Sequence, residues 1–192
     1  DMNIPVGVSD FEKIRNGGFY YIDKSGLITR ILKEKAEVTL IARPRRFGKT
    51  LGMSMLESFF DIRKDSRKLF DGLEIAENQA LCDEWMNQYP TVSISFRQID
   101  GLNFMDAYRQ LVYEIALLYQ KHTYLLDSQA ISNQEKSLFQ QISDRKAEKT
   151  DVMRSIQFLT LLLNKHYNKK VILLIDEYDV PIAKANNNGY RS

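Results

Sequence analysis

Apolar residues in this chain fall into three short runs and several longer patterns with helical spacing. Residues 38–42 and 171–175 are almost continuously apolar and rich in branched side chains, which is typical of strands covered on both faces. Residues 92–96 instead alternate apolar and polar side chains, as in a strand with one buried face. The three runs therefore predict three strands.

Elsewhere, apolar residues recur at the three- and four-residue spacing of amphipathic helices. The clearest example begins at Asn103 and places Phe104, Tyr108, Leu111, Ile115 and Tyr119 on one face. Further helices are predicted over residues 25–33 (capped by Asp23 or Ser25), 49–62, a stretch around 81–86, a surface helix within 128–149, and 151–167, with a basic, turn-rich section at 63–72. Helices that alternate with buried strands indicate an α/β fold with a parallel sheet in three layers.

Residues 43–50, Arg-Pro-Arg-Arg-Phe-Gly-Lys-Thr, lie between the first predicted strand and a helix, which is the setting of a phosphate-binding loop (P-loop). Gly48 lets the backbone approach phosphate, the Lys49 ammonium can lie between the β- and γ-phosphates, and the Thr50 hydroxyl can ligate Mg²⁺. Arg43 replaces the first glycine of the usual G-x-x-x-x-G-K-[ST] pattern. The motif predicts a site for ATP and Mg²⁺, although Gly-Lys-Thr alone is equally compatible with a basic residue before a surface helix.

Two adjacent carboxylates, Asp176 and Glu177, follow the last apolar run. Burying them without a cation would cost on the order of several kcal/mol each, a cost that Mg²⁺ and a lysine would relieve. In P-loop NTPases such an aspartate holds the Mg²⁺ water shell, and the following glutamate can act as general base toward water. The alternative is that both acids only begin a solvated turn. Combined with the P-loop motif, they favour an NTPase site.

The overall composition adds few constraints. The net charge of +2 gives no general attraction to nucleic acid or membrane, although Arg43, Arg45, Arg46 and Lys49 form a local basic cluster. The single cysteine excludes an internal disulfide and fits a reducing compartment, so a cytoplasmic location is expected. No apolar run reaches the roughly 18 residues of a membrane span. His122 has no metal-ligand partner at a suggestive spacing, and His166 near a helix end is expected to be hydrogen-bonded or to face solvent, so no zinc site is expected.

Several segments together resemble the AAA-ATPase-like family of bacterial proteins, which often carry a PD-(D/E)xK nuclease-like domain further downstream. The matching residues cover nearly the whole chain: residues 8–11, 20–25, 43–50, 69–73, 89–90 and 176–181. In that family an arginine in place of the first P-loop glycine is normal. The resemblance implies an ATPase of the additional-strand type, in which Lys49, Thr50, Asp176 and Glu177 have the roles given above.

The resemblance also predicts how the chain is organised. Residues 1–37 are expected to form a lead-in segment that packs on the core, and residues 38–192 to form an incomplete P-loop NTPase core. In the additional-strand architecture, the strand that follows Asp176 and Glu177 inserts beside the P-loop strand and carries a polar sensor residue, and no candidate follows Pro181. The chain is therefore expected to be an N-terminal fragment, or a longer protein of which this is the first part. If it is a true fragment, its unpaired strand edges are expected to drive dimerisation or strand exchange.

The first functional hypothesis is an ATP-binding, Mg²⁺-dependent ATPase that drives or gates a downstream domain. The expected assignments are nucleotide binding by Arg45, Arg46, Phe47, Gly48, Lys49, Thr50 and Leu51, metal binding by Thr50 and Asp176, and catalysis by Glu177 and Lys49. Arg45 and Arg46 could contact a γ-phosphate or a neighbouring subunit, or could form a solvated basic rim. Tyr21 and Ile22 could wall the adenine pocket, although core packing is the favoured interpretation for both.

Two other hypotheses remain open from the sequence. The chain could be a nucleotide-dependent switch that binds ATP with little hydrolysis. It could also belong to a DNA-processing or defence protein, because the loop is basic and the family partner is nuclease-like, although the near-neutral net charge argues against this segment as the main DNA contact.

Overall fold

The centre of the molecule is a parallel sheet of three strands, with strand order β1-β3-β2. The structure is a computed structural model that describes residues 10–17, 21, 23–34, 40–43, 49–96, 99 and 103–176. The strands are β1 (Leu40–Arg43), β2 (Thr91–Ser95) and β3 (Ile172–Asp176), and β3 pairs in parallel with both of the others. The predicted α/β class with a parallel sheet is confirmed.

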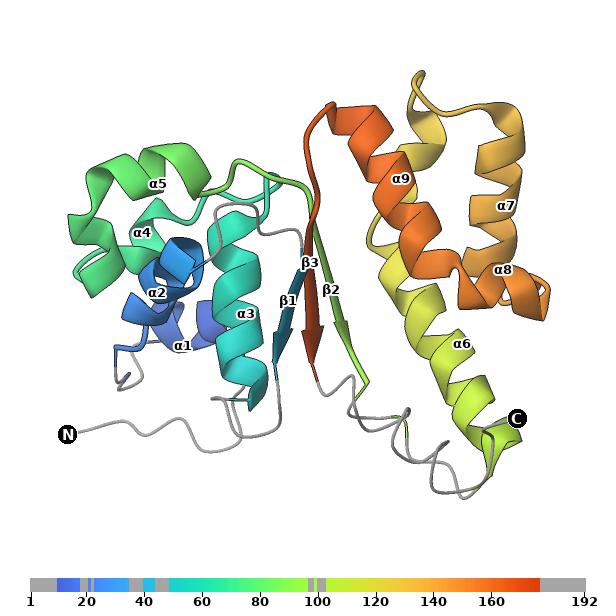
Figure 1. Ribbon diagram of the computed structural model, residues 1–192, viewed down its shortest axis with the longest axis horizontal. Helices are drawn as coiled ribbons and strands as arrows, with labels where there is room; N and C mark the ends of the chain where they lie inside the picture. Colours follow the sequence, from blue (N-terminus) through green and yellow to red (C-terminus); the bar gives the residue numbers. More distant parts are fainter. Residues whose placement is uncertain are drawn as a thin grey trace.

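Helices lie on both sides of this sheet (Figure 1). One side carries α1 (Phe11–Asn16), α2 (Gly26–Glu34), α3 (Lys49–Phe60), α4 (Arg67–Phe70), the 3₁₀ turn η1 (Glu74–Glu77) and α5 (Gln79–Trp85). The other side carries α6 (Phe104–Gln120), η2 (Thr123–Asp127), α7 (Asn133–Ser143), α8 (Lys149–Met153) and α9 (Ser155–Tyr167). Strands far apart in the sequence thus meet between two helical layers.

The central position of β3 explains its continuous apolar sequence. Alternate residues of a strand point to opposite faces of the sheet. Ile172 and Leu174 are buried in the core under α3, whereas Leu173 and Ile175 pack against the core on the opposite face. Both faces of β3 therefore need apolar side chains, as the sequence predicted.

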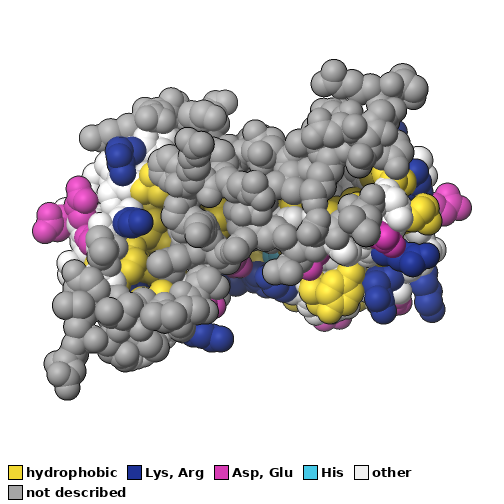
Figure 2. Space-filling model, turned by 90° about the horizontal axis from the view of Figure 1, so that it is seen from below, with side chains coloured by type: hydrophobic (Ala, Val, Ile, Leu, Met, Phe, Trp, Pro, Cys, Tyr) yellow, Lys and Arg dark blue, Asp and Glu magenta, His cyan; other side chains and the backbone are white. Residues whose placement is uncertain are grey.

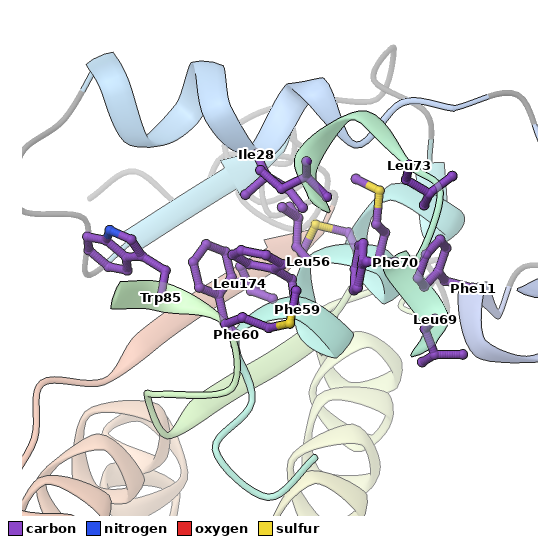
Figure 3. Packing of buried hydrophobic residues seen from close by; sticks show 14 of the residues in the cluster. Phe11, Ile28, Leu56, Phe59, Phe60, Leu69, Phe70, Leu73, Trp85 and Leu174 are labelled. Atoms are coloured by element: carbon purple, nitrogen blue, oxygen red, sulfur yellow. The ribbon is translucent and has the colours of Figure 1, made fainter. Parts of the chain in front are cut away.

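The core on the α3 side is rich in aromatic rings, which Figure 3 shows gathered beside Leu174 of β3. The ring centroids of Phe59 and Phe60 lie 5.1 Å apart with an interplanar angle of 87°, and those of Phe59 and Phe70 lie 5.4 Å apart at 82°. Phe11 of α1 also joins this core, 4.9 Å from Phe70. The two contacts of Phe59 are edge-to-face, and pairs of this kind add to the hydrophobic stabilisation of buried rings.

The core on the other side is formed mainly by α6, α7 and α9. Ile115 and Tyr119 of α6 are buried there, together with Phe139 of α7 and Leu163 of α9. Asn103 accepts a hydrogen bond from the backbone N–H of Asp106 and caps α6, which confirms the predicted start of that helix. The predicted surface helix within 128–149 is α7.

Several predicted boundaries were wrong. The single helix expected over 151–167 is divided into α8 and α9 at Arg154, and the section at 63–72 contains the short helix α4. The Asp23 and Ser25 side chains also make long-range bonds that the sequence did not predict. Asp23 Oδ1 accepts from the N–H of Ser25 just before α2, whereas Asp23 Oδ2 accepts from the N–H of Glu74 and Ser25 Oγ from the N–H of Ile75, so both residues attach the start of α2 to η1.

Candidate functional site

The pairing of β1 with β3 brings the two predicted halves of the site to one edge of the sheet. Their register places Arg43, the last residue of β1, directly opposite Asp176, the last residue of β3. Because paired strands lie about 4.8 Å apart, the chain leaves both strands side by side. Helix α3 then begins at Lys49. The segments that carry Lys49 and Asp176 therefore meet at the carboxyl edge of the sheet, where ligands bind in open α/β folds.

The structure describes only part of the predicted residue set. Lys49, Thr50 and Leu51 form the first turn of α3, and Asp176 ends β3; for these four residues the backbone is described. Arg45, Arg46, Phe47, Gly48, Glu177 and the predicted pocket residue Ile22 lie outside the described residues. The described backbone thus brings the helix start and the aspartate strand together, and the loop between β1 and α3 remains a prediction from the sequence.

The position of the α3 N-terminus is fixed by the burial of the rest of this helix. Met55, Leu56, Phe59 and Phe60 are almost fully buried, and α3 packs on both β3 and β2. Ser54 of α3 also accepts a hydrogen bond of 2.9 Å from the backbone N–H of Phe11. The first turn of a helix held in this way presents unpaired N–H groups and the positive end of the helix dipole, an arrangement that favours an anion.

Ser95 is a further candidate residue of the site, and the sequence patterns did not identify it. It ends β2 and lies directly opposite Asp176 in the register of β2 and β3. Its hydroxyl-bearing side chain is half-buried at the same sheet edge as the start of α3. In the sequence, Ser95 is only the last polar residue of an alternating run. Its place beside Asp176 follows from the strand order, which the sequence does not give.

Tyr21, considered as part of an adenine pocket, packs on the aromatic core. Its ring lies 5.5 Å from that of Phe11 in an edge-to-face contact, and its hydroxyl donates to the Met55 sulfur at 3.3 Å. Burial raises the pKa of Tyr21, so its hydroxyl stays protonated. These contacts support the packing role that the sequence favoured.

A polar cluster joins the far end of α3 to the opposite helical layer. Asp61, which follows α3, is buried and lies 3.4 Å from the Arg63 guanidinium. Arg63 Nη1 donates to the Lys121 carbonyl at 2.6 Å, and the guanidinium carbon lies 5.3 Å from the Tyr124 ring centroid. The Tyr124 hydroxyl in turn bonds His122 Nδ1 at 3.0 Å. The C-terminal end of α3 is therefore attached to the α6–η2 segment.

A polar hollow of about 540 Å³ lies elsewhere, between α4 and α5. Its lining includes Lys64, Arg67, Asp83 and the free Cys82, whose Sγ donates to the Ile75 carbonyl at 3.3 Å. Burial, followed by the nearby Asp83, raises the pKa of the Cys82 thiol, which keeps it protonated and a poor nucleophile. The hollow contains no residue of the predicted nucleotide site.

Within the described residues, no helix combines the length and hydrophobicity needed to cross a bilayer. Among the side chains that the structure describes, which do not include that of Asp176, no three His, Cys, Asp or Glu are placed together to hold a metal ion.

Comparison with known proteins gives one relative and one family. The chain is 28% identical over 180 residues to an "Uncharacterized protein in vnfD 5'region" of Azotobacter chroococcum mcd 1. The match covers 93% of this chain but only 29% of that relative's length. No solved structure matches. A family model described as "Predicted AAA-ATPase" matches residues 5–192, and the chain therefore belongs to the AAA-ATPase-like family.

Proposed function

We propose that this chain is an ATP-binding, Mg²⁺-dependent P-loop NTPase module with a three-layer sandwich fold, which hydrolyses ATP to drive or gate a downstream domain. The observation that carries the proposal is the register of β1 and β3, in which Arg43 pairs with Asp176. That register brings the start of α3 and the end of the aspartate strand to one sheet edge, which is the arrangement that the two sequence motifs require. Membership of the AAA-ATPase-like family supports the same activity.

The residues at this edge suit Mg²⁺-ATP in charge and chemistry. The Lys49 ammonium and the N–H groups of the first α3 turn would hold the phosphates, with Arg45 and Arg46 adding positive charge. Oxygen ligands are those that Mg²⁺ prefers, and Thr50 and Asp176 would supply a hydroxyl and a carboxylate. Bound Mg²⁺ would neutralise charge that develops on the transferred phosphoryl group. Glu177 would orient and deprotonate the attacking water.

Nucleotide binding can be tested by titrating Mg²⁺-ATP and Mg²⁺-GTP into the wild-type chain by calorimetry. Lys49→Ala should weaken binding at least about tenfold, because it removes a charge-assisted contact to phosphate. Lys68→Ala is the matched control, since Lys68 is an exposed lysine of α4, and this variant should bind as the wild type does. Equal affinity of the Lys49→Ala variant and the wild type would refute the site.

Hydrolysis needs a separate test, because a nucleotide-dependent switch would also bind ATP. Glu177→Gln keeps the size of the side chain but removes the base, so kcat should fall by about 10² to 10⁴ while ATP affinity is retained. Phosphate release under saturating Mg²⁺-ATP measures the effect. If wild type and Glu177→Gln show the same negligible turnover and both bind ATP, the chain is a switch and not an ATPase.

The role of the whole protein is a broader part of the proposal. The chain spans 29% of the length of the Azotobacter relative, so a longer protein of this kind has room for further domains. A nuclease-like domain acting on DNA is the candidate that the family resemblance suggests for the driven partner. Any DNA binding by this chain itself would appear as a salt-sensitive mobility shift, and a shift that is absent or insensitive to salt would leave DNA contact to other domains.

A further inference from the structure

The outer face of α6 carries a row of large, solvent-exposed side chains at regular four-residue spacing. This α6 stripe consists of Met105, Arg109, Tyr113 and Leu117. Met105 is 57% exposed, Tyr113 49% and Leu117 37%, whereas Ile115 and Tyr119 on the inner face are buried. Residues four apart on a helix form one of the ridges through which helices pack. The stripe is therefore a packing ridge that points away from the core of its own chain.

The chemistry around the α6 stripe suits another protein surface better than nucleic acid. The Arg109 side chain makes no hydrogen bond or ion pair with any residue in the described part of the chain. The positive charge of Arg145 lies 5.8 Å from the centroid of the Tyr113 ring. Two negative charges, those of Glu114 and Asp106, lie beside the stripe on α6. Figure 2 likewise shows basic, acidic and apolar side chains intermixed at its right-hand end. A surface with both signs of charge and exposed apolar side chains is typical of a protein interface.

We propose that the α6 stripe is the interface of a homodimer in which the α6 helices of two copies pack antiparallel across a two-fold axis. The stripe is symmetric about the point midway between Arg109 and Tyr113. An antiparallel partner therefore places Met105 against Leu117 of the second copy, and Arg109 against Tyr113 of the second copy, each contact occurring twice. The partner that fits the stripe is a second copy of the chain.

The side chains in each pair favour the antiparallel arrangement over a parallel one. Met105 of one copy and Leu117 of the other bury apolar surface against each other. A guanidinium over a tyrosine ring is an attractive cation–π contact. A parallel arrangement would bring Arg109 against Arg109 of the second copy, which places like charges together. Two ridges of four-residue spacing interdigitate in the most common class of helix crossing, so the backbones need no distortion. A two-fold interface also closes on itself and gives a dimer instead of a fibre.

Sedimentation velocity across a range of protein concentrations tests the dimer. The wild-type chain should shift from monomer to dimer as concentration rises, and Tyr113→Glu and Leu117→Glu should each raise the dimer Kd at least about tenfold. Leu161→Glu is the matched control, because Leu161 is a comparably exposed apolar residue of α9 outside the stripe. Circular dichroism checks that each variant is folded, which is expected because the altered side chains are exposed. A monomer at every concentration, or a dimer unchanged by Tyr113→Glu, would overturn the proposal.

Cross-linking tests the antiparallel arrangement and separates it from association through strand edges. In a Cys82→Ala background, Met105→Cys and Leu117→Cys chains are mixed and treated with a short thiol cross-linker. The mixed pair should cross-link much more than either variant alone. Preferential cross-linking of Met105→Cys with itself, or equal yields in all samples, would contradict the proposed pairing. Neither test depends on nucleotide, so the dimer proposal can fail while the proposed ATPase stands.

Discussion

His122 is a buried ionisable residue whose surroundings oppose its positive charge. It is 2% exposed, and its Nδ1 bonds the Tyr124 hydroxyl at 3.0 Å. Burial, and then the positive charges of Arg63 and Lys121, lower the pKa of His122 to about 3. The folded chain therefore holds this imidazole neutral at physiological pH, where it serves as a hydrogen-bond partner.

This lowered pKa gives the stability of the chain a predictable pH dependence. Below the ordinary histidine pKa of about 6.5, the unfolded chain binds a proton at His122 that the folded chain does not. The free energy of unfolding should thus fall as pH decreases from about 6.5 toward 3, with a contribution of His122 that approaches about 1.4 kcal/mol per pH unit. Urea denaturation at several pH values measures it.

His122→Gln provides the comparison for that experiment, since the amide can still bond Tyr124 but does not titrate. Carboxylates titrate in both proteins, so their contribution cancels in the difference between the two free energies of unfolding. The variant should become progressively more stable relative to the wild type as pH falls below about 6.5. A difference that is flat with pH would show that His122 has an ordinary pKa in the folded chain.

At the scale of elements, local signals define some helix ends and tertiary contacts define others. Helix α7 begins with a capping box, in which Ser132 Oγ accepts from the N–H of Glu135 and the Glu135 carboxylate accepts from the N–H of Ser132. Asn168, in the left-handed conformation with φ of 53°, ends α9. Such caps are encoded in a few adjacent residues and can act without the rest of the fold.

The capping box predicts a measurable cost for removing it. Ser132→Ala should lower the free energy of unfolding by about 0.5–2 kcal/mol, because the N–H of Glu135 loses its acceptor. Ser137→Ala is the control, since Ser137 is an exposed residue within the same helix where alanine is the better helix former. Thermal or urea unfolding should therefore separate the two variants, and equal stability would mean that the capping box contributes nothing.

These elements show which parts of the fold were predictable. Strong patterns located all three strands and the start of α6, because their spacing directly reflects which faces are buried. The division between α8 and α9 was not predictable, because the apolar spacing continues across Arg154 and the start of α9 is bound by a residue distant in sequence, Tyr119, whose hydroxyl donates to the Ser155 carbonyl. The roles of Asp23 and Ser25 were missed for the same reason, since their partners in η1 are distant in sequence.

At the scale of the whole molecule, the sheet and the polar cluster of Asp61, Arg63 and Tyr124 connect the two helical layers. The sequence predicted that the P-loop segment and the aspartate strand would converge, and the pairing of Arg43 with Asp176 agrees with that expectation. It did not predict the polar cluster, because Asp61 lies at the end of the predicted helix over 49–62, Arg63 begins the basic, turn-rich section, and their partners lie in the α6–η2 segment. Long-range polar contacts of this kind have no periodic signal in the sequence.

Arg63 is expected to be the most important residue of this cluster. Arg63→Ala removes the bond to the Lys121 carbonyl and leaves the buried Asp61 carboxylate without its cation, so the free energy of unfolding should fall by about 2–4 kcal/mol. Hydrogen exchange should accelerate first in η2 and the last turn of α6. Arg67→Ala, at an exposed arginine of α4, should leave both measurements unchanged. Uniform exchange across the chain in Arg63→Ala would indicate a general loss of stability and not a local connection.

The connection of the C-terminal end of α3 to the opposite helical layer has a consequence for how a bound nucleotide would be sensed. A helix of 12 residues is a stiff rod about 18 Å long, and α3 extends from the carboxyl edge of the sheet to Asp61 at the amino edge. Met55, Leu56, Phe59 and Phe60 pack the C-terminal half of this rod into a dense core, which transmits a tilt instead of absorbing it. A tilt of α3 on nucleotide binding would therefore reach the opposite helical layer through Arg63, which follows α3 and donates to the Lys121 carbonyl.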